Sequence, residues 1–592
     1  MRRLVFSLAL IGTLSLTGCS LKQMIQKAEE QRVEVTPSPL ELHADTVTFD
    51  ISATLPVGML KKGKVYTIYP YYTYNGTEIA LDGIEFVADD YTDQDVEPRI
   101  TKSFSFAYSP EMQRGALEAE GEAKDPRNGK TLRTPARLPL AVGIITTSTR
   151  TSDPFGVGYA EHGYNNQEEL IATAISFYFE QGRSQLRRSE LRSNRGNDYD
   201  AFIAAKNITR TVTITGTHSP EGTERINSDL AEDRAAAIEA WYRKQMDKYD
   251  YEGMADSIEF ILKPVVESWD LFKEKLAAYE GITADQKNAV LYILNKAGGD
   301  FESKEDELQE LSFYKKLFND IYPDLRRAKS EILTVKPKKT DAEIAILAKQ
   351  IAGGSVSADT LSMEELMYAG TLTPSIQEKV DIYMAAVKKG DTWEAHNNLG
   401  AALLAQANRD GDMAKVEKAV THLETAKSKA GNNSALPAAN LGMAYYMQGN
   451  LEGAYETMTA AAGMSPSMDA QKIINSVKGV LEIKMAMYDQ ALTTFARVEA
   501  TAANYTNKGL TQILLKDYAA GISSLDDALE EDSKYAMAYY LKAVASARLK
   551  NTENVISNLV KAFEADPELK EVASNDLEFV NLASNPDFTA IF

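Results

Sequence analysis

The sequence predicts a multidomain α+β protein in which a β-sandwich, a βαβ module and an all-α superhelix follow one another. Three observations predict this order. Residues 35–150 contain short segments that alternate between polar and apolar side chains, residues 165–336 show strands separated by helices, and the chain after residue 340 is helical and rich in alanine. With 592 residues, the chain is also too long to fold around one hydrophobic core.

The composition and the motif content disfavour nucleic-acid binding and catalysis. The formal net charge is −21 at pH 7, whereas binding to phosphates requires clustered lysine and arginine. The histidines show no metal-binding spacing, and no nucleophile elbow, zinc-protease or phosphate-loop motif occurs. Since Cys19 is the only cysteine, disulfides within the chain and four-cysteine zinc sites are excluded. We therefore expect no enzyme activity, no nucleic acid, no metal and no cofactor.

Residues 1–18 have the layout of a secretory signal peptide. Arg2 and Arg3 precede an apolar stretch over residues 4–16, which is too short to span a bilayer. Residues 16–18, followed by Cys19, resemble the lipobox of bacterial lipoproteins. This resemblance implies cleavage before Cys19 and covalent attachment of lipid, such as palmitate, which holds the mature chain in a membrane.

The residues after Cys19 indicate where the lipoprotein is sorted. Ser20 rather than aspartate follows the cysteine, which resembles the outer-membrane sorting pattern of many Gram-negative lipoproteins. No acidic cluster of the kind found in surface-exported Bacteroidetes lipoproteins follows directly, so the periplasmic face is favoured. We expect residues 19–34 to form the lipid anchor at the outer membrane, with the polar residues 21–32 as a short tether or helix.

Residues 35–150 are expected to form the β-sandwich. Residues 47–53 and 104–108 alternate with period two, and residues 65–72 are β-branched and aromatic. Asn-Gly and Asp-Gly turn signals separate these segments. Short strands at such spacing predict a sandwich of immunoglobulin type.

Residues 165–336 resemble the C-terminal domain family of OmpA. Two strands are expected at residues 175–179 and 211–216, each followed by a helix. The residues at the offsets typical of the family are Gly216, Gly222, Asn227, Leu230, Arg234 and Ala235. The sequence around residues 321–328 resembles the long-insert form of this domain found in Bacteroidetes proteins, so a long insert is expected.

The resemblance to OmpA implies a site for peptidoglycan. Family members hold the diamino acid of peptidoglycan through an aspartate and an arginine, which pair with its charged groups. Arg234 stands at the arginine position, whereas Ser219 replaces the aspartate, and Glu221 is the candidate substitute for the missing charge. Asn227 completes the candidate site. Two alternatives stay open: binding of peptidoglycan, or a module converted to contacts with proteins.

Residues 337–592 are expected to be helical. Residues 337–374 are interpreted as a helical linker, residues 375–570 as a repeat array and residues 571–592 as a capping helix region. The clearest repeat has tetratricopeptide spacing at Leu441, Gly442, Tyr445, Ala454, Ala461 and Pro466. The array therefore resembles four or five tetratricopeptide (TPR) repeats, the first with a long insertion between its two helices.

The TPR resemblance implies a superhelix whose concave face binds peptides or proteins. The candidate residues on this face are Asn397, Asn440, Tyr505 and Tyr539. For the two asparagines, contact with a partner's backbone and bridging of neighbouring helices both stay open. For the two tyrosines, packing between helices is favoured.

Together these patterns resemble a Bacteroidetes-type outer-membrane lipoprotein with an OmpA-like domain and TPR repeats. The expected function is a lipid-anchored periplasmic scaffold that binds envelope proteins through its repeats, within a fimbrial, secretion or outer-membrane assembly. Such a scaffold raises the local concentration of its partners without new chemistry. The alternative is a cell-wall anchor that binds peptidoglycan through the OmpA-like domain.

Overall fold

The computed structural model describes residues 20–91, 95–265 and 269–592. The predicted signal peptide and Cys19 lie outside the described residues. No helix in the described part of the chain is long and apolar enough to cross a membrane.

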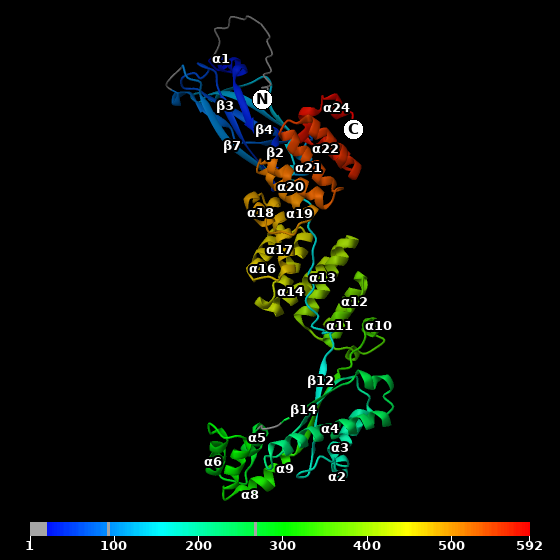
Figure 1. Cartoon of the computed structure of the whole chain (residues 1–592). Coiled ribbons are helices and arrows are strands. Elements are labelled where there is room, and N and C mark those ends of the chain that lie inside the picture. The colour runs from blue at the N-terminus through cyan, green and yellow to red at the C-terminus, as the bar shows by residue number, and fades with distance from the viewer. Residues whose placement is uncertain (1–19, 92–94, 266–268) are drawn as a thin grey trace. The chain divides into compact units, whose positions relative to one another are not determined.

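The chain folds into two compact units (Figure 1). The first unit combines the N-terminal part of the chain, up to Tyr164, with Asp341–Phe592. The second unit is Asn165–Thr340. In the sequence, the second unit is therefore an insertion within the first.

The N-terminal part of the first unit is β-rich, as predicted. One sheet consists of β1 (Arg32–Thr36), β2 (Leu40–His43), β3 (Thr46–Thr54), β7 (Arg99–Ala107) and β11 (Ile144–Ile145). In this sheet β3 pairs antiparallel with β1, β2 and β7, and β2 pairs parallel with β11.

A second sheet is built around β4 and β8. It consists of β4 (Val65–Tyr74), β5 (Thr77–Ala80), β6 (Ile84–Val87), β8 (Ala116–Asp125), β9 (Lys130–Arg133) and β10 (Leu138–Val142). Apolar side chains from both sheets form one hydrophobic core. In this core Tyr72 on β4 packs against Phe106 on β7, with ring centroids 4.9 Å apart.

Of the two alternatives for the segment after Cys19, a tether or a short helix, the structure shows a helix, and this helix is folded onto the β-rich part. The helix is α1 (Ser20–Lys27), which contacts β8 and β9. Leu21 and Met24 lie three positions apart, on one face of the helix, and are buried in the β-rich core. The ammonium of Lys27 also donates a hydrogen bond to the carbonyl of Val57 (2.9 Å). The polar residues around Leu21 and Met24 concealed this apolar face from the sequence pattern.

The C-terminal part of the first unit is a series of helix hairpins, as predicted. Each hairpin packs two helices against each other across a short turn. The hairpins are α13 (Trp393–Asp410) with α14 (Met413–Ala430), α15 (Leu436–Met447) with α16 (Leu451–Ala462), α17 (Met468–Lys484) with α18 (Tyr488–Phe495), α19 (Ala502–Leu514) with α20 (Tyr518–Glu531), and α21 (Ala536–Arg548) with α22 (Thr552–Ala565). We refer to these helices, with those that extend them at either end, as the array.

Additional helices extend the array at both ends. Before the hairpins lie α10 (Asp341–Ala352), α11 (Met363–Ala369) and α12 (Ile376–Lys389). After them lie α23 (Leu569–Asn575), a 3₁₀ helix η9 (Leu577–Leu582) and α24 (Pro586–Thr589). Phe579 and Phe588 from this final stretch are buried in the core of the last hairpins.

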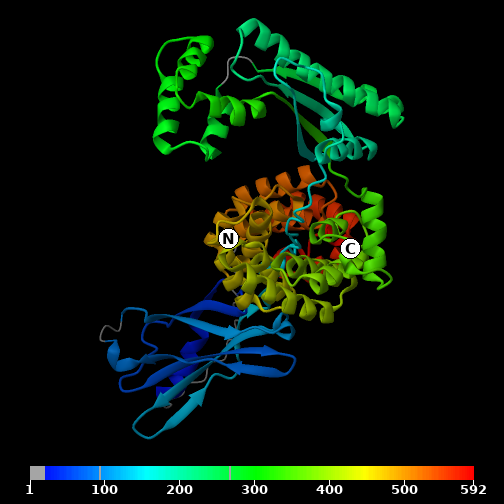
Figure 2. The same ribbon diagram turned by 90° about the horizontal axis from the view of Figure 1, so that it is seen from below.

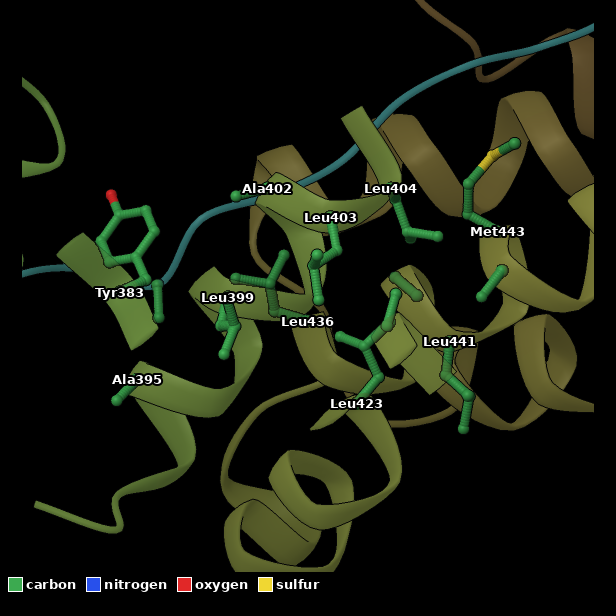
Figure 3. Packing of buried hydrophobic residues seen from close by; sticks show 14 of the residues in the cluster. Tyr383, Ala395, Leu399, Ala402, Leu403, Leu404, Leu423, Leu436, Leu441 and Met443 are labelled. Carbon is green, nitrogen blue, oxygen red and sulfur yellow. The ribbon is translucent and has the colours of Figure 1, made fainter. Parts of the chain in front are cut away.

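Small residues allow the two helices of a hairpin to approach closely. A Cβ atom added at Gly442 on α15 would meet the Met458 side chain on α16 at 2.9 Å. Figure 3 shows the apolar side chains that fill the space between neighbouring helices, with Leu399, Leu423 and Leu441 among them. The packing of large side chains against small ones fixes the spacing of the helices.

The start of the array differs from the prediction in two respects. α10 and α11 fall within the predicted linker, yet Ile344 and Leu366 belong to the same hydrophobic core as α12 and α13. The first hairpin also has no insertion, because α13 and α14 are each 18 residues long. The additional residues lengthen both helices, and the Asp412 side chain caps the start of α14 by accepting a hydrogen bond from the Ala414 N–H.

The second unit contains a mixed sheet covered on one face by helices. Its strands lie in the order β12 (Leu170–Tyr178), β15 (Arg327–Val335), β13 (Thr209–Gly216) and β14 (Glu259–Pro264). β13 and β14 are parallel, and α4 (Glu224–Lys248) connects them. α4 and α3 (Asn194–Ala204) bury the apolar face of the sheet.

The two ends of the second unit lie next to each other, as is common in domains inserted into another domain. The ammonium of Lys338 donates a hydrogen bond to the carbonyl of Gln167 (2.7 Å). Lys336 and Glu169 form an ion pair at 2.9 Å. The chain therefore enters and leaves this unit at one place.

A helical lobe with its own core lies between β14 and β15 in the sequence. It contains α5 (Asp270–Ala278), α6 (Ala284–Asn295), α7 (Phe301–Gln309), α8 (Tyr314–Lys316) and α9 (Tyr322–Leu325). Glu305 on α7 is 3% exposed and accepts hydrogen bonds from the hydroxyls of Tyr314 (2.5 Å) and Tyr322. Burial raises the pKa of Glu305 to about 7, although the two hydrogen bonds oppose this rise.

We predict that the lobe loses stability as the pH rises from about 4.5 to about 7, the ordinary and the folded-state pKa of Glu305. Within this range the folded state retains a proton that the unfolded state has lost. The full effect is about 3 kcal/mol, since one pKa unit corresponds to roughly 1.4 kcal/mol. Hydrogen exchange of the amides in α7, measured on the whole chain at about pH 5 and about pH 8, checks this prediction.

Glu305→Gln is the matched control, because the amide keeps partners for both tyrosine hydroxyls but does not titrate. The change in stability of the lobe between about pH 5 and about pH 8 should be much smaller in the variant than in the wild type. Equal pH dependence in the two proteins would contradict the assigned role of Glu305.

Candidate protein-binding site

The groove of the array contains a segment of the chain itself. Residues 150–164 connect the β-rich part to the second unit and have no regular secondary structure. Figure 2 shows this segment, in cyan, passing through the middle of the ring of helices. Ala160 is buried within the hydrophobic core of the array, and Val157 and Tyr164 pack against that core. We call residues 150–164 the threaded segment.

Asparagine side chains on the first helices of the hairpins hold the backbone of the threaded segment. Asn440 on α15 accepts a hydrogen bond from the Gly158 N–H (2.9 Å) and donates one to the Gly158 carbonyl (2.7 Å). Asn398 on α13 makes the same pair of bonds to Ala160, at 2.6 and 3.1 Å. Each carboxamide therefore pairs with the N–H and the C=O of one residue, which satisfies both backbone groups in a buried position.

Two further asparagines complete the contact. Asn507 on α19 accepts from the Ser152 N–H (2.7 Å) and donates to the Ser152 carbonyl (2.9 Å). Asn397 donates to the Gly158 carbonyl (3.1 Å) and accepts a hydrogen bond from the Asn440 amide (2.9 Å). We call Asn397, Asn398, Asn440 and Asn507 the asparagine ladder.

Aromatic contacts and the close approach of one glycine also hold the threaded segment in the groove. The ring of Tyr164 stacks on that of Tyr368, with centroids 4.9 Å apart, and Tyr159 lies beside Tyr383. A Cβ atom at Gly158 would meet the Cδ1 atom of Leu436 at 2.3 Å. A side chain at position 158 would therefore require the Leu436 side chain to shift.

The four residues predicted on the concave face have different surroundings. Asn397 and Asn440 hold peptide backbone, but this backbone belongs to the chain itself rather than to a partner. Tyr505 and Tyr539 pack against the core of the last hairpins, where the ammonium groups of Lys508 and Lys561 lie over their rings.

Asn398 and Asn507 were missed by sequence analysis, although the sequence contains a signal for them. Asn398, Asn440 and Asn507 each stand two residues before the glycine of their repeat, at Gly400, Gly442 and Gly509. This position places the three side chains on equivalent points of successive first helices. Aligning the repeats on these glycines would have identified all three asparagines.

The β-rich part contacts the C-terminal end of the array through a cluster of charges. Arg548 on α21 pairs with Glu41 on β2 (2.7 Å) and with Glu578 on η9 (2.6 Å). The Thr147 hydroxyl donates to Glu578 (2.6 Å). Burial opposes ionisation of Glu41, but hydrogen bonds and charges from His43 and Arg548 outweigh it and lower the pKa of Glu41 to about 2. This cluster joins β2 and Thr147, three residues before the threaded segment, to the end of the array.

The predicted peptidoglycan arginine in the second unit is engaged internally. Arg234 is 1% exposed, and its guanidinium donates hydrogen bonds to the carbonyls of Thr217 (2.8 Å), Arg183 (3.0 Å) and Glu180 (3.3 Å). Burial, together with the positive charge of nearby Arg326, lowers the pKa of Arg234 to about 10. The side chain therefore ties β13 to the loop after β12.

The other three predicted residues are also paired within the unit. Ser219 accepts a hydrogen bond from Nε of Arg326 (2.9 Å), and Glu221 forms an ion pair with the same guanidinium (2.6 Å). Asn227 is buried and donates to the carbonyl of Gly222 (3.2 Å). Arg326 thus supplies the positive charge that Glu221 faces, and sequence analysis did not identify it.

Comparisons with known proteins return structural neighbours only. No family model matches the chain, and no curated protein matches it. A structure of MamA from Desulfovibrio magneticus RS-1 is 18% identical and covers 30% of this chain and 97% of its own, with a TM-score of 0.27.

Two further neighbours are comparable. YrrB, described as a TPR protein with an unusual peptide-binding site, is 18% identical and covers 32% of this chain and 97% of its own, with a TM-score of 0.28. PilF of Pseudomonas aeruginosa is 15% identical and covers 41% of this chain and 98% of its own, with a TM-score of 0.29. The helical stretch thus has TPR proteins among its neighbours, at TM-scores too low to transfer a function.

We predict that Asn440→Ala destabilises the first unit by about 1–3 kcal/mol, because the buried Gly158 N–H loses its partner. Chemical denaturation followed by circular dichroism measures this change. Limited proteolysis should also cut the variant faster within residues 150–164.

Asn433→Ala is the control for this prediction, since Asn433 is an exposed asparagine in the same array. It should leave both stability and proteolysis unchanged. If the two variants behave alike, the ladder does not hold the threaded segment.

Proposed function

We propose that this protein is a non-catalytic scaffold that is anchored by lipid on Cys19 and binds other proteins of the bacterial envelope. The observation that carries the proposal is the array, whose groove recognises extended peptide backbone through repeated asparagine contacts. Such contacts bind the peptide backbone rather than a particular side chain, so they are suited to binding segments of other proteins. We extend the proposal to an outer-membrane location on the periplasmic side and to a fimbrial, secretion or outer-membrane assembly.

The folding of α1 onto the β-rich part supports this arrangement. α1 begins at Ser20, directly after the predicted lipid site, and its buried Leu21 and Met24 attach it to the domain core. A lipid on Cys19 would therefore keep the β-rich part close to the membrane surface. We propose that the two packed sheets of this part are an immunoglobulin-like sandwich, and that the repeats of the array are TPR units.

For the second unit we favour an OmpA-like module that serves protein contacts. The parallel β13–α4–β14 connection and the position of Arg234 support the OmpA-like assignment. The peptidoglycan alternative is not favoured by the geometry, because Arg234 is buried and Glu221 is neutralised by Arg326. A ligand with an ammonium and a carboxylate would have to break both arrangements.

We predict that Cys19→Ser moves the protein from the membrane fraction to the soluble fraction, because serine cannot receive the thioether-linked lipid. Mass spectrometry of the purified N-terminus and fractionation of cells measure the two consequences. Ser20→Ala is the control and should stay in the membrane fraction. Recovery of Cys19→Ser in the membrane fraction would contradict lipid anchoring.

The scaffold proposal itself is tested by crosslinking in cells, followed by mass spectrometry of the captured proteins. A photo-crosslinking residue at an exposed position of the array should capture the same envelope proteins in repeated experiments. Absence of any reproducible partner would contradict the proposal.

We predict that purified sacculi do not retain the protein in a manner that depends on Arg234. Arg234→Ala should lower the thermal stability of the second unit, because three backbone carbonyls lose their donor. Co-sedimentation with sacculi, compared between the wild type and this variant, measures binding. Specific retention of the wild type that the folded variant loses would support the peptidoglycan alternative instead.

A further inference from the structure

The asparagine ladder is interrupted at one hairpin. On α17 the position two residues before the repeat glycine, Gly479, is occupied by Val477. An apolar side chain cannot pair with backbone groups, so the threaded segment is not held at this point. Among the described residues, Phe155, Gly156 and Val157 accordingly have no backbone hydrogen bond to another protein group.

A groove of about 660 Å³ lies alongside this unheld stretch, within the volume range typical of ligand sites. One wall is formed by residues 153–159 of the threaded segment, and the opposite wall by α17 and the start of α19. Ile473 and Val477 contribute apolar surface. Phe155 is 41% exposed, which is unusual for a phenylalanine next to a core.

The charges that line the groove are mainly negative. Asp153, Asp469 and Glu499 are carboxylates, whereas Lys472 is the lining ammonium. Glu499 pairs with Lys472 at 2.9 Å, and Asp153 pairs with Lys484, outside the groove lining, at 3.7 Å. Asp469 is an exposed residue on the first turn of α17 and forms no ion pair at 4.0 Å or less among the described residues. The groove therefore attracts a positively charged occupant more than a negatively charged one.

We propose that this groove binds an extended segment of a partner protein in which apolar residues alternate with lysine or arginine. The segment would lie beside residues 155–157 as an added strand and use their unmade backbone hydrogen bonds. Its apolar side chains would contact Phe155, Ile473 and Val477, and its basic side chains would face Asp469. The threaded segment thus provides half of a binding site whose other half is the array.

This proposal rests on the scaffold function and names the surface that carries it. The test uses the purified mature chain and a fluorescent pentapeptide of alternating lysine and valine, with a glutamate-and-valine pentapeptide as the control ligand. We expect the basic peptide to bind and the acidic peptide to bind at least about tenfold more weakly, a difference of about 1.4 kcal/mol. Absence of binding by the basic peptide, or equal binding of both, would overturn the proposal.

Three variants locate the site. Ala503→Trp fills the groove from α19, Phe155→Ala removes the exposed ring, and Asp469→Lys reverses the charge at the surface. Each should weaken binding of the basic peptide about tenfold, while circular dichroism shows an unchanged fold. Ala519→Trp is the matched control, because Ala519 is exposed on α20 and does not line the groove.

The variants also separate this proposal from the scaffold function. If Ala503→Trp and Asp469→Lys leave binding of the peptide unchanged, the groove is not the site. If they abolish peptide binding but crosslinking in cells finds no partner, the scaffold function fails instead. Loss of crosslinked partners in these two variants, but not in Ala519→Trp, would support both.

Discussion

A buried extended backbone needs hydrogen-bond partners, and in the first unit asparagine carboxamides supply them. The threaded segment forms neither a helix nor a strand, so its N–H and C=O groups lack the regular backbone partners that these elements provide. Asn398, Asn440 and Asn507 pair with both backbone groups of Ala160, Gly158 and Ser152. These contacts make it possible for the array to close around a piece of its own chain, and the remaining features of the unit are consistent with this constraint.

The order of the chain gives this constraint a functional meaning. The threaded segment precedes the second unit in the sequence, whereas the array follows it, so the groove is occupied by a segment that is covalently part of the same unit. For a partner protein, most of the groove would therefore already be occupied by the threaded segment. The part of the groove beside Val477 is not completely occupied. Binding of a segment there would add to the threaded segment rather than replace it.

The second unit shows a comparable use of polar groups inside the fold. Residues that resemble a ligand site in sequence are directed toward partners within the unit: Arg234 toward backbone carbonyls, and Ser219 and Glu221 toward Arg326. A buried guanidinium is stable only when its donors are bonded, and loop carbonyls at the end of the sheet provide such partners. The charges thus stabilise the module from within.

The sequence by itself determined the β-rich N-terminal part and the helical C-terminal part, because periodicity and small-residue spacing are local properties that can be recognised from neighbouring residues alone. It also indicated that asparagines such as Asn397 and Asn440 face the inside of the array. Only the tertiary structure decided which backbone groups these asparagines bind and that α1 belongs to the β-rich core. It also decided that Arg326 forms an ion pair with Glu221. These features depend on residues separated by tens to hundreds of positions, and no local pattern records which distant backbone group will complete a hydrogen bond.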